Sequence, residues 1–319
     1  MPAVSSWVLS IRQQVRRLDL RDRDVVNRRT LFSSLVAPGS FFLSFIRVRN
    51  LTHVYTPRVG PSLEALRGVD LEIDAGEYLA VVGANGSGKT TLACHLNALL
   101  LPTAGDVWVD GRNTREPAHM RAIRSTVGMV FQSPADQLVA TMVQEDVAFG
   151  PENLGVPQPQ LSQQVREALQ RVQMWHARQR PPHLLSAGQQ QRVAIAGVLA
   201  MRPRCLILDE ATAMLDPQGR RDVLNIVEQL HRSGLMVITI THMMEEALRA
   251  RRIVVMHRGR VAMDGTPQEV FASSHLAEWG LTLPPAAELA RRLRARSPSF
   301  PGGVLTADQL AQAVTEVLR

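Results

Sequence analysis

Short apolar runs, separated by polar and glycine-rich segments, recur along the chain from about residue 45 onward. Ile46–Tyr55 and Leu66–Ile73 alternate apolar and polar residues, which predicts strands with one buried face. Several later runs are apolar on consecutive residues, as expected for parallel strands covered on both faces. The later runs are Tyr78–Val82, Val107–Val109, Val127–Phe131, Cys205–Leu208, Met236–Ile240 and Ile253–Met256.

Helical periodicity replaces the strand pattern between Gln132 and Met201, where glutamine is frequent. We interpret about 133–201 as a helical subdomain set into an α/β core. A helix is also expected over Thr90–Leu101, before Pro102. Two more are expected in the tail, over Ala286–Arg296 and Thr306–Leu318.

Composition and charge narrow the class of protein. The chain has 319 residues, 45% of them hydrophobic, which is enough to bury a sizeable core in one or two domains. The two cysteines, Cys94 and Cys205, lack metal-ligand and disulfide spacing, which fits a reducing cytoplasm. Residues 1–49 hold nine Arg and three Asp, so six of the seven surplus positive charges lie there. The rest shows no basic stripe, and we expect no nucleic-acid partner.

The basic N-terminal stretch, residues 1–44, contains no chemical motif. Its apolar part, Leu31–Ile46, is interrupted by Ser, Pro and Gly and is too short to span a bilayer. We interpret residues 1–44 as a disordered extension, with an arm on a membrane surface as the alternative.

The stretch GANGSGKTT, residues 83–91, contains Lys89, the only lysine in the chain. It fits G-x-x-x-x-G-K-[ST], between a predicted strand and a predicted helix, which is the context that this phosphate-binding motif requires. Glycines let backbone N–H groups surround phosphate oxygens, Lys89 would reach the β and γ phosphates, and Thr90 would place its hydroxyl on Mg²⁺. The sequence therefore predicts binding of a nucleoside triphosphate.

Four further motifs follow in a fixed order: LSAGQQQ at Leu185–Gln191, CLILDE at Cys205–Glu210, MLDP at Met214–Pro217, and His242 after a strand. Each alone has an ordinary structural reading, such as a helix cap or a solvated loop. Their joint order resembles the nucleotide-binding subunit of an ATP-binding-cassette (ABC) transporter. The resemblance implies an α/β P-loop NTPase fold, with a RecA-like mixed sheet, an antiparallel β-subdomain and a helical subdomain.

The resemblance also implies a role for each site residue. Asp209 would hold Mg²⁺ through water, Glu210 would polarise the attacking water, and His242 would orient that water and the γ phosphate. Tyr55 matches the aromatic that stacks on adenine, and Gln132 matches the glutamine that joins Mg²⁺ to the helical subdomain. The expected ATP-binding residues are Tyr55, Gly83, Asn85, Gly86, Ser87, Gly88, Lys89, Thr90, Thr91 and Gln132, and the expected Mg²⁺ ligands are Thr90, Gln132 and Asp209.

A second group of residues is expected to act on the ATP of a partner subunit. These are Ser186, Gly188, Gln189 and Asp216. Two ATP molecules would then be sandwiched head to tail, so that hydrolysis requires a dimer. The chain has Ala187 where the family usually has glycine and Met243 where aspartate commonly follows the histidine, and both leave the catalytic side chains in place.

Two segments look like the ATPases of energy-coupling factor (ECF) importers and of their cobalt and nickel relatives: Phe131–Gly155 and Gln189–Arg220. Within the second segment, the sequence DEATAMLDP is more similar to the first of the two paralogous ATPases of these importers. The tail is similar to a C-terminal dimerisation module. The expected domains are therefore 45–280 for the ATPase and 281–319 for that module.

The expected function is ATP hydrolysis that powers uptake of a vitamin or a transition-metal ion, at the cytoplasmic face of the cell membrane. Partners would be a second ATPase, either a copy or a paralogue, a membrane T component and a substrate-binding S component. The segment containing Leu138 and Met142 borders the groove for a T-component helix in the resembled family. Another ABC importer class remains an alternative. So does a soluble ABC ATPase of repair or translation, although no heptads lie between Lys89 and Ser186 and one cassette is present.

Overall fold

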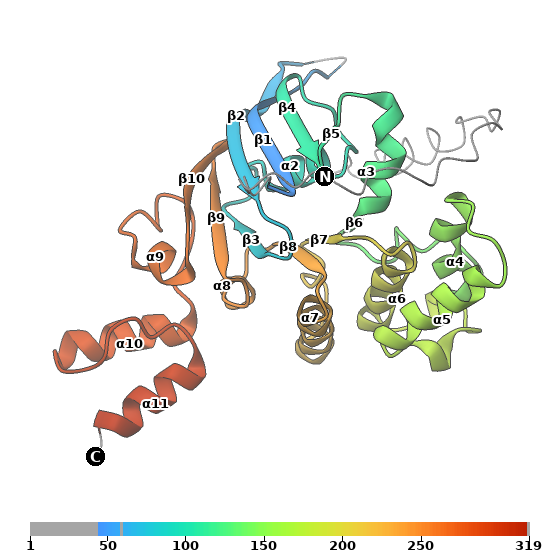
Figure 1. The fold of residues 1–319 in the computed structure, drawn as a ribbon. Coiled ribbons are helices and arrows are strands. Elements are labelled where there is room, and N and C mark those ends of the chain that lie inside the picture. Colours follow the sequence, from blue (N-terminus) through green and yellow to red (C-terminus); the bar gives the residue numbers. More distant parts are fainter. Residues whose placement is uncertain (1–43, 58–59, 318–319) are drawn as a thin grey trace, which may run out of the picture. The chain divides into compact units, whose positions relative to one another are not determined.

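The computed structural model describes residues 44–57 and 60–317, and the expectation for residues 1–44 lies, apart from Ser44, outside them. The described residues form one compact unit (Figure 1). The smaller sheet has the strand order β2-β1-β4-β5 and is antiparallel. Its strands are β1 (Ile46–Tyr55), β2 (Leu63–Ile73), β4 (Ala104–Val109) and β5 (Arg112–Asn113). The predicted β1 is confirmed with both bounds.

The larger sheet has the order β10-β9-β3-β8-β7-β6. Its strands are β3 (Tyr78–Val82), β6 (Val127–Val130), β7 (Cys205–Asp209), β8 (Met236–Ile240), β9 (Arg252–His257) and β10 (Arg260–Gly265). All neighbours are parallel except β9 and β10, so the sheet is mixed, as expected. β10 was not predicted, and its residues are exposed or half-buried, unlike those of the central strands.

Alternate residues of β3 enter two different cores, which explains why its sequence is apolar throughout. Ala80 and Val82 pack in a cluster that contains Leu169 and Ile195 from the helical segment. Leu79 and Val81 pack in a cluster shared with the smaller sheet. A parallel strand covered on both faces must be apolar on both.

Three α-helices form the helical segment: α4 (Val143–Asn153), α5 (Gln160–Arg171) and α6 (Ala187–Ala200). They lie together in Figure 1, with the short 3-10 helices η2 (Trp175–Ala177) and η3 (Pro182–Leu184) between α5 and α6. Residues 133–142 at the start of the predicted subdomain form turns and bends.

The other helices lie between strands or follow the last strand. They are α2 (Lys89–Leu96), η1 (Pro117–His119), α3 (Met120–Thr126), α7 (Pro217–Arg232), α8 (Met244–Ala247), α9 (Pro267–Ala272), α10 (Pro285–Arg296) and α11 (Ala307–Val317). The prediction that the first helix extends to Leu101 was wrong. Ala98 has a φ of 56°, a left-handed backbone that interrupts the helix. The N–H groups of Leu99 and Leu100 both donate to the Cys94 carbonyl instead.

The tail forms both predicted helices, α10 and α11. Ala290, Phe300 and Ala313 make a small core between them, while Ala287 belongs to the larger core that contains Ala80 and Leu206. Leu289 and Val317 are exposed apolar residues on these helices. Within the described ranges, none of the helices has the length and apolar character needed to cross a bilayer.

Candidate functional site

The glycine loop joins the carboxyl end of β3 to α2 and is wedged against neighbouring backbone. Gly83 and Gly88 have φ values of 149° and 103°. A Cβ on Gly83 would lie 2.2 Å from the Met256 carbonyl oxygen, and one on Gly88 would lie 2.7 Å from the Ala65 carbonyl oxygen. Both glycines are therefore required by close approach as well as by backbone conformation.

Lys89, the first residue of α2, is buried at the mouth of this loop. Its Nζ donates to the Gly83 carbonyl at 2.8 Å and to the Ala84 carbonyl at 3.0 Å. Burial lowers the pKa of Lys89, while the nearby carboxylates of Glu210 and Asp209 act in the opposite direction. The ammonium is thus held against the loop by two backbone carbonyls.

Asp209 ends β7 beside this loop and is buried. The Thr90 hydroxyl donates to its Oδ1 at 3.1 Å. Burial raises the pKa of Asp209 to about 6, and Glu210 adds to the rise, while Thr90 and Lys89 oppose it. A carboxylate next to a hydroxyl is the oxygen donor set that Mg²⁺ prefers, so these two residues fit the expected ion.

Glu210 is the next residue, but its backbone conformation is not that of a strand. Its φ is 49°, an uncommon left-handed value for a residue with a side chain, and its N–H donates to the Ile240 carbonyl at 2.9 Å. Its Oε2 lies 3.4 Å from Nδ1 of His242, whose side chain is 52% exposed. The sheet register, which pairs Asp209 with Ile240, brings these two loops to one edge.

Tyr55 and Gln132 lie at the borders of the same region. The Tyr55 hydroxyl is 3.2 Å from Thr91 Oγ1, and its ring stands edge-on to His53 with centroids 4.5 Å apart. Gln132 is exposed, two residues beyond β6. Val130 pairs with Leu208, so Gln132 lies at the sheet edge that carries the carboxylates. Of the remaining loop residues, Ser87 is buried, while Asn85 and Gly86 are exposed.

The residues expected to act on a partner gather at two adjacent helix N-termini. Ser186 caps α6 in a capping box with Gln189, and Asp216 caps α7 by accepting from the Gly219 N–H at 3.1 Å. A Cβ on Gly188 would lie 3.2 Å from the Gly219 Cα, so the two helices nearly touch. Ala187 is exposed beside them.

A hollow of about 180 Å³ opens between these helix ends. It is lined by Ser186, Gly188, Gln189, Arg192, Asp216, Gln218, Gly219 and Asp222. The four residues predicted for the partner site are therefore brought together. Arg192, Gln218, Gly219 and Asp222 were not predicted, although Arg192 and Gly219 lie one helical turn after Gly188 and Asp216, which is a usable signal.

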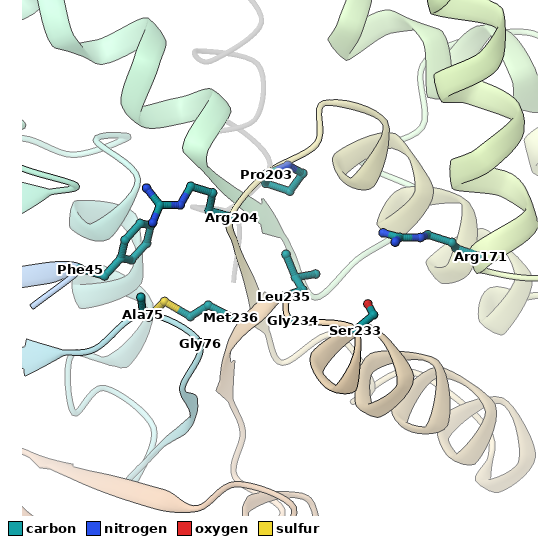
Figure 2. Close-up of a pocket in the computed structure, with 10 residues that line it drawn as sticks. All are labelled: Phe45, Ala75, Gly76, Arg171, Pro203, Arg204, Ser233, Gly234, Leu235 and Met236. Atoms are coloured by element: carbon teal, nitrogen blue, oxygen red, sulfur yellow. The ribbon is translucent and has the colours of Figure 1, made fainter. Parts of the chain in front are cut away.

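A larger hollow, of about 290 Å³, lies at the opposite edge of the sheet (Figure 2). Its lining includes Gly76, Arg204 and Met236, which stand just before or at the start of β3, β7 and β8. The Arg204 guanidinium stacks on Phe45 and binds Asp110 at 2.7 Å. In open α/β sheets, ligands bind at the carboxyl ends of the strands, so this hollow is not the reaction site.

Comparison with known proteins gives consistent results. The family model described as ABC transporter matches residues 66–213. An energy-coupling factor transporter ATP-binding protein, EcfA1, of Symbiobacterium thermophilum is 57% identical over 255 residues, which cover 79% of this chain and 89% of that protein.

Two solved structures have the same fold. CbiO1 from Clostridium perfringens, described as part of the ABC transporter complex CbiONQ, is 34% identical with a TM-score of 0.66, covering 80% of this chain and 96% of that one. The ATP-binding cassette MJ0796, in a dimeric post-hydrolysis state bound to ADP and Pi, is 27% identical with a TM-score of 0.62, covering 70% and 98%.

Proposed function

The chain belongs to the ABC transporter family and, within it, to the energy-coupling factor transporter ATP-binding proteins. It is therefore an ATPase subunit of an importer. We propose which of its residues bind ATP, which hydrolyse it, and which couple hydrolysis to the membrane subunits. The observation that carries the proposal is the meeting of Lys89, Thr90, Asp209, Glu210 and His242 at the carboxyl edge of one sheet.

The phosphate loop binds the triphosphate of ATP. N–H groups of the loop and of the first turn of α2 face the β and γ phosphate oxygens, and the Lys89 ammonium neutralises their charge. Thr90 and Asp209 hold Mg²⁺, which neutralises phosphate charge when bound. Gln132 adds a further ligand, and Tyr55, fixed against Thr91, offers a ring face for adenine.

Glu210 and His242 carry the hydrolytic step. The left-handed backbone at Glu210 separates its carboxylate from the Mg²⁺ ligand Asp209, so that it can accept a proton from water. His242, 3.4 Å from Glu210, is placed to hold the water and the γ phosphate in line.

The hollow at the starts of α6 and α7 receives the triphosphate bound by a second ATPase subunit. Two capped helix N-termini meet at Gly188 and Gly219, and their backbone N–H groups, with Arg192 in the lining, suit an anion. This is the basis for proposing that Ser186, Gly188, Gln189 and Asp216 act in trans.

The ATPase acts with membrane subunits, a T component that it moves and an S component that binds a vitamin or metal ion. It would then lie on the cytoplasmic side of the membrane. The exposed side chains of Val139 and Phe149, 54% and 51% accessible, support a docking surface on the helical segment. Residues 281–319 are proposed to contribute to dimerisation through the exposed Leu289 and Val317.

Glu210→Gln tests the hydrolytic assignment. The full-length variant should keep its MgATP affinity, because Lys89, Thr90 and Asp209 are intact, and lose about 10²- to 10⁴-fold in hydrolysis rate as expected for a general base. Binding is measured by titration of a fluorescent ATP analogue, and hydrolysis by phosphate release. Glu245→Gln, an exposed carboxylate on α8, is the matched control. Hydrolysis within a few-fold of wild type would place the base elsewhere.

A further inference from the structure

One buried carboxylate outside the expected site contacts the loops on which the expected catalytic residues lie. Glu246 lies on α8, four residues after His242, and is 4% exposed. The Thr212 hydroxyl donates to its Oε1 at 2.5 Å and the Thr241 hydroxyl donates to its Oε2 at 2.9 Å. Nε of Arg220 lies 3.8 Å from Oε1. Each carboxylate oxygen therefore faces a different segment of the chain.

Thr241 links Glu246 to the histidine loop. While its hydroxyl donates to Glu246, its oxygen accepts the Met243 N–H at 3.0 Å. His242 is thus enclosed in a short turn closed by the Thr241 side chain. Because Thr241 is 2% exposed, water does not replace either bond. The orientation of the hydroxyl, and with it the turn that presents His242, depends on Glu246.

Thr212 links the same carboxylate to the loop between Glu210 and Asp216. The Ala213 N–H donates to the Glu210 carbonyl at 3.0 Å, and the Leu215 N–H donates to the Thr212 carbonyl at 3.1 Å. Successive turns therefore connect Glu210 to the cap of α7. Holding Thr212 fixes the middle of this connection.

Arg220 links Glu246 to the first turn of α7. Its N–H donates to the Asp216 carbonyl at 2.9 Å, and its side chain, 27% exposed, approaches the buried carboxylate. Asp216 lines the hollow proposed for the partner's triphosphate. The three contacts thus join this chain's own hydrolytic residues to the surface that completes the other site.

We propose that Glu246 is a positioning residue for hydrolysis, which sets the mutual placement of the Glu210, His242 and Asp216 loops through Thr212, Thr241 and Arg220. This inference rests on the proposed roles of those three residues. A hydrogen bond to a charged buried group contributes more than a neutral one, and its loss leaves the hydroxyl partner unsatisfied. Removal of Glu246 therefore releases both loops at once.

The first test compares Glu246→Ala with Glu246→Gln in the full-length protein. Glu246→Ala should lower kcat for ATP hydrolysis about tenfold or more, as expected when a hydrogen-bonded charge worth over 1.4 kcal/mol is lost. The affinity for MgATP should stay within about threefold, because Lys89, Thr90 and Asp209 lie outside the network. Glu246→Gln should restore part of kcat, since its amide can accept one hydroxyl and donate to the other.

Amide hydrogen exchange distinguishes positioning from general stability. In Glu246→Ala, exchange should accelerate in residues 211–216 and 241–244 and stay unchanged in β3 and α2. Glu245→Ala, a neighbouring exposed carboxylate, should change neither exchange nor kcat. Unchanged hydrolysis in Glu246→Ala would overturn the proposal. A fall in kcat would also overturn it if MgATP affinity and thermal stability fell as well and exchange did not accelerate in the two loops.

Variants that each remove one hydrogen bond to Glu246 keep the inference testable if Glu246→Ala does not fold. Thr212→Val and Thr241→Val preserve shape and remove one bond each. The double variant should lose less activity than the product of the two single losses, because both act through one carboxylate. Independent effects would contradict the shared role. Failure of Glu210→Gln to slow hydrolysis would instead reject the underlying catalytic assignment.

Discussion

At the residue scale, the single lysine has a physical explanation. In a chain with 36 Lys and Arg residues, only Lys89 is lysine, and its ammonium is enclosed by the Gly83 and Ala84 carbonyls. An ammonium is compact and rotates freely, whereas a guanidinium is a planar fork. The Lys89 ammonium donates to both loop carbonyls, and we expect a planar guanidinium not to fit between them.

Lys89→Arg should therefore weaken MgATP binding at least about tenfold although charge is conserved, a change of roughly 1.4 kcal/mol or more. Titration with a fluorescent ATP analogue measures the affinity. Arg232→Lys, the reverse exchange at an exposed side chain, should have no effect and serves as the control. Near-normal affinity in Lys89→Arg would remove the explanation for the single lysine.

Other properties of single residues were not predictable from the sequence. The DE pair marked Asp209 and Glu210, but the left-handed backbone that separates their side chains depends on the Ile240 carbonyl, 30 positions away. Glu246 was not predicted, because its partners Thr212 and Thr241 approach it only through the fold. The positions of residues in a local motif can be predicted, whereas contacts between loops cannot.

At the element scale, strands were predicted well because burial on both faces leaves a continuous apolar run, as in β3 and β8. The end of α2 was missed, since the left-handed turn at Ala98 has no glycine to signal it. The helical segment was identified as such, but the sequence did not separate its exposed apolar residues from its core. Val143 and Val147 are buried and Leu138 packs partly on the core, whereas Val139 and Phe149 are exposed.

The difference between buried and exposed apolar residues restricts the expected surface for coupling to the membrane subunits to the exposed ones. Phe149→Arg should release the membrane subunits and abolish uptake, because a charge would replace an apolar anchor for a helix of the T component. MgATP binding and the thermal stability of the isolated chain should be unchanged, since the side chain is 51% exposed. Co-purification and uptake assays provide the measurement, with Leu101→Arg, at an exposed apolar residue after α2, as the control. Uptake retained in Phe149→Arg would move the docking surface elsewhere.

At the scale of the whole molecule, the two functional regions of one chain belong to different reactions. In the proposed arrangement, the phosphate loop with Glu210 would form one half of a site, and the hollow at Gly188 and Gly219 would form the other half of a second site. In a symmetric pair, each half meets its complement on the other subunit. A defect in one region should therefore be separable from a defect in the other.

Mixing two inactive variants tests this arrangement. Lys89→Ala disables the phosphate loop. Gly219→Val disturbs the hollow, because there is no room for a side chain at this position. A Cβ alone would lie 2.7 Å from the Asp216 Oδ1 and 3.5 Å from the Gly188 Cα. Gly197→Ala, on α6 with open space at its Cβ, is the matched control and should keep full activity.

In a mixed pair, the phosphate loop of the Gly219→Val chain meets the intact hollow of the Lys89→Ala chain, which restores one complete site. Random pairing makes about half of the dimers mixed, each with one site of two, so hydrolysis should recover to roughly a quarter of wild type. Each variant alone should stay near background while retaining its thermal transition. Background hydrolysis in the mixture, with both variants folded, would show that a second copy of this chain does not complete the site and would direct the search to a paralogous ATPase partner.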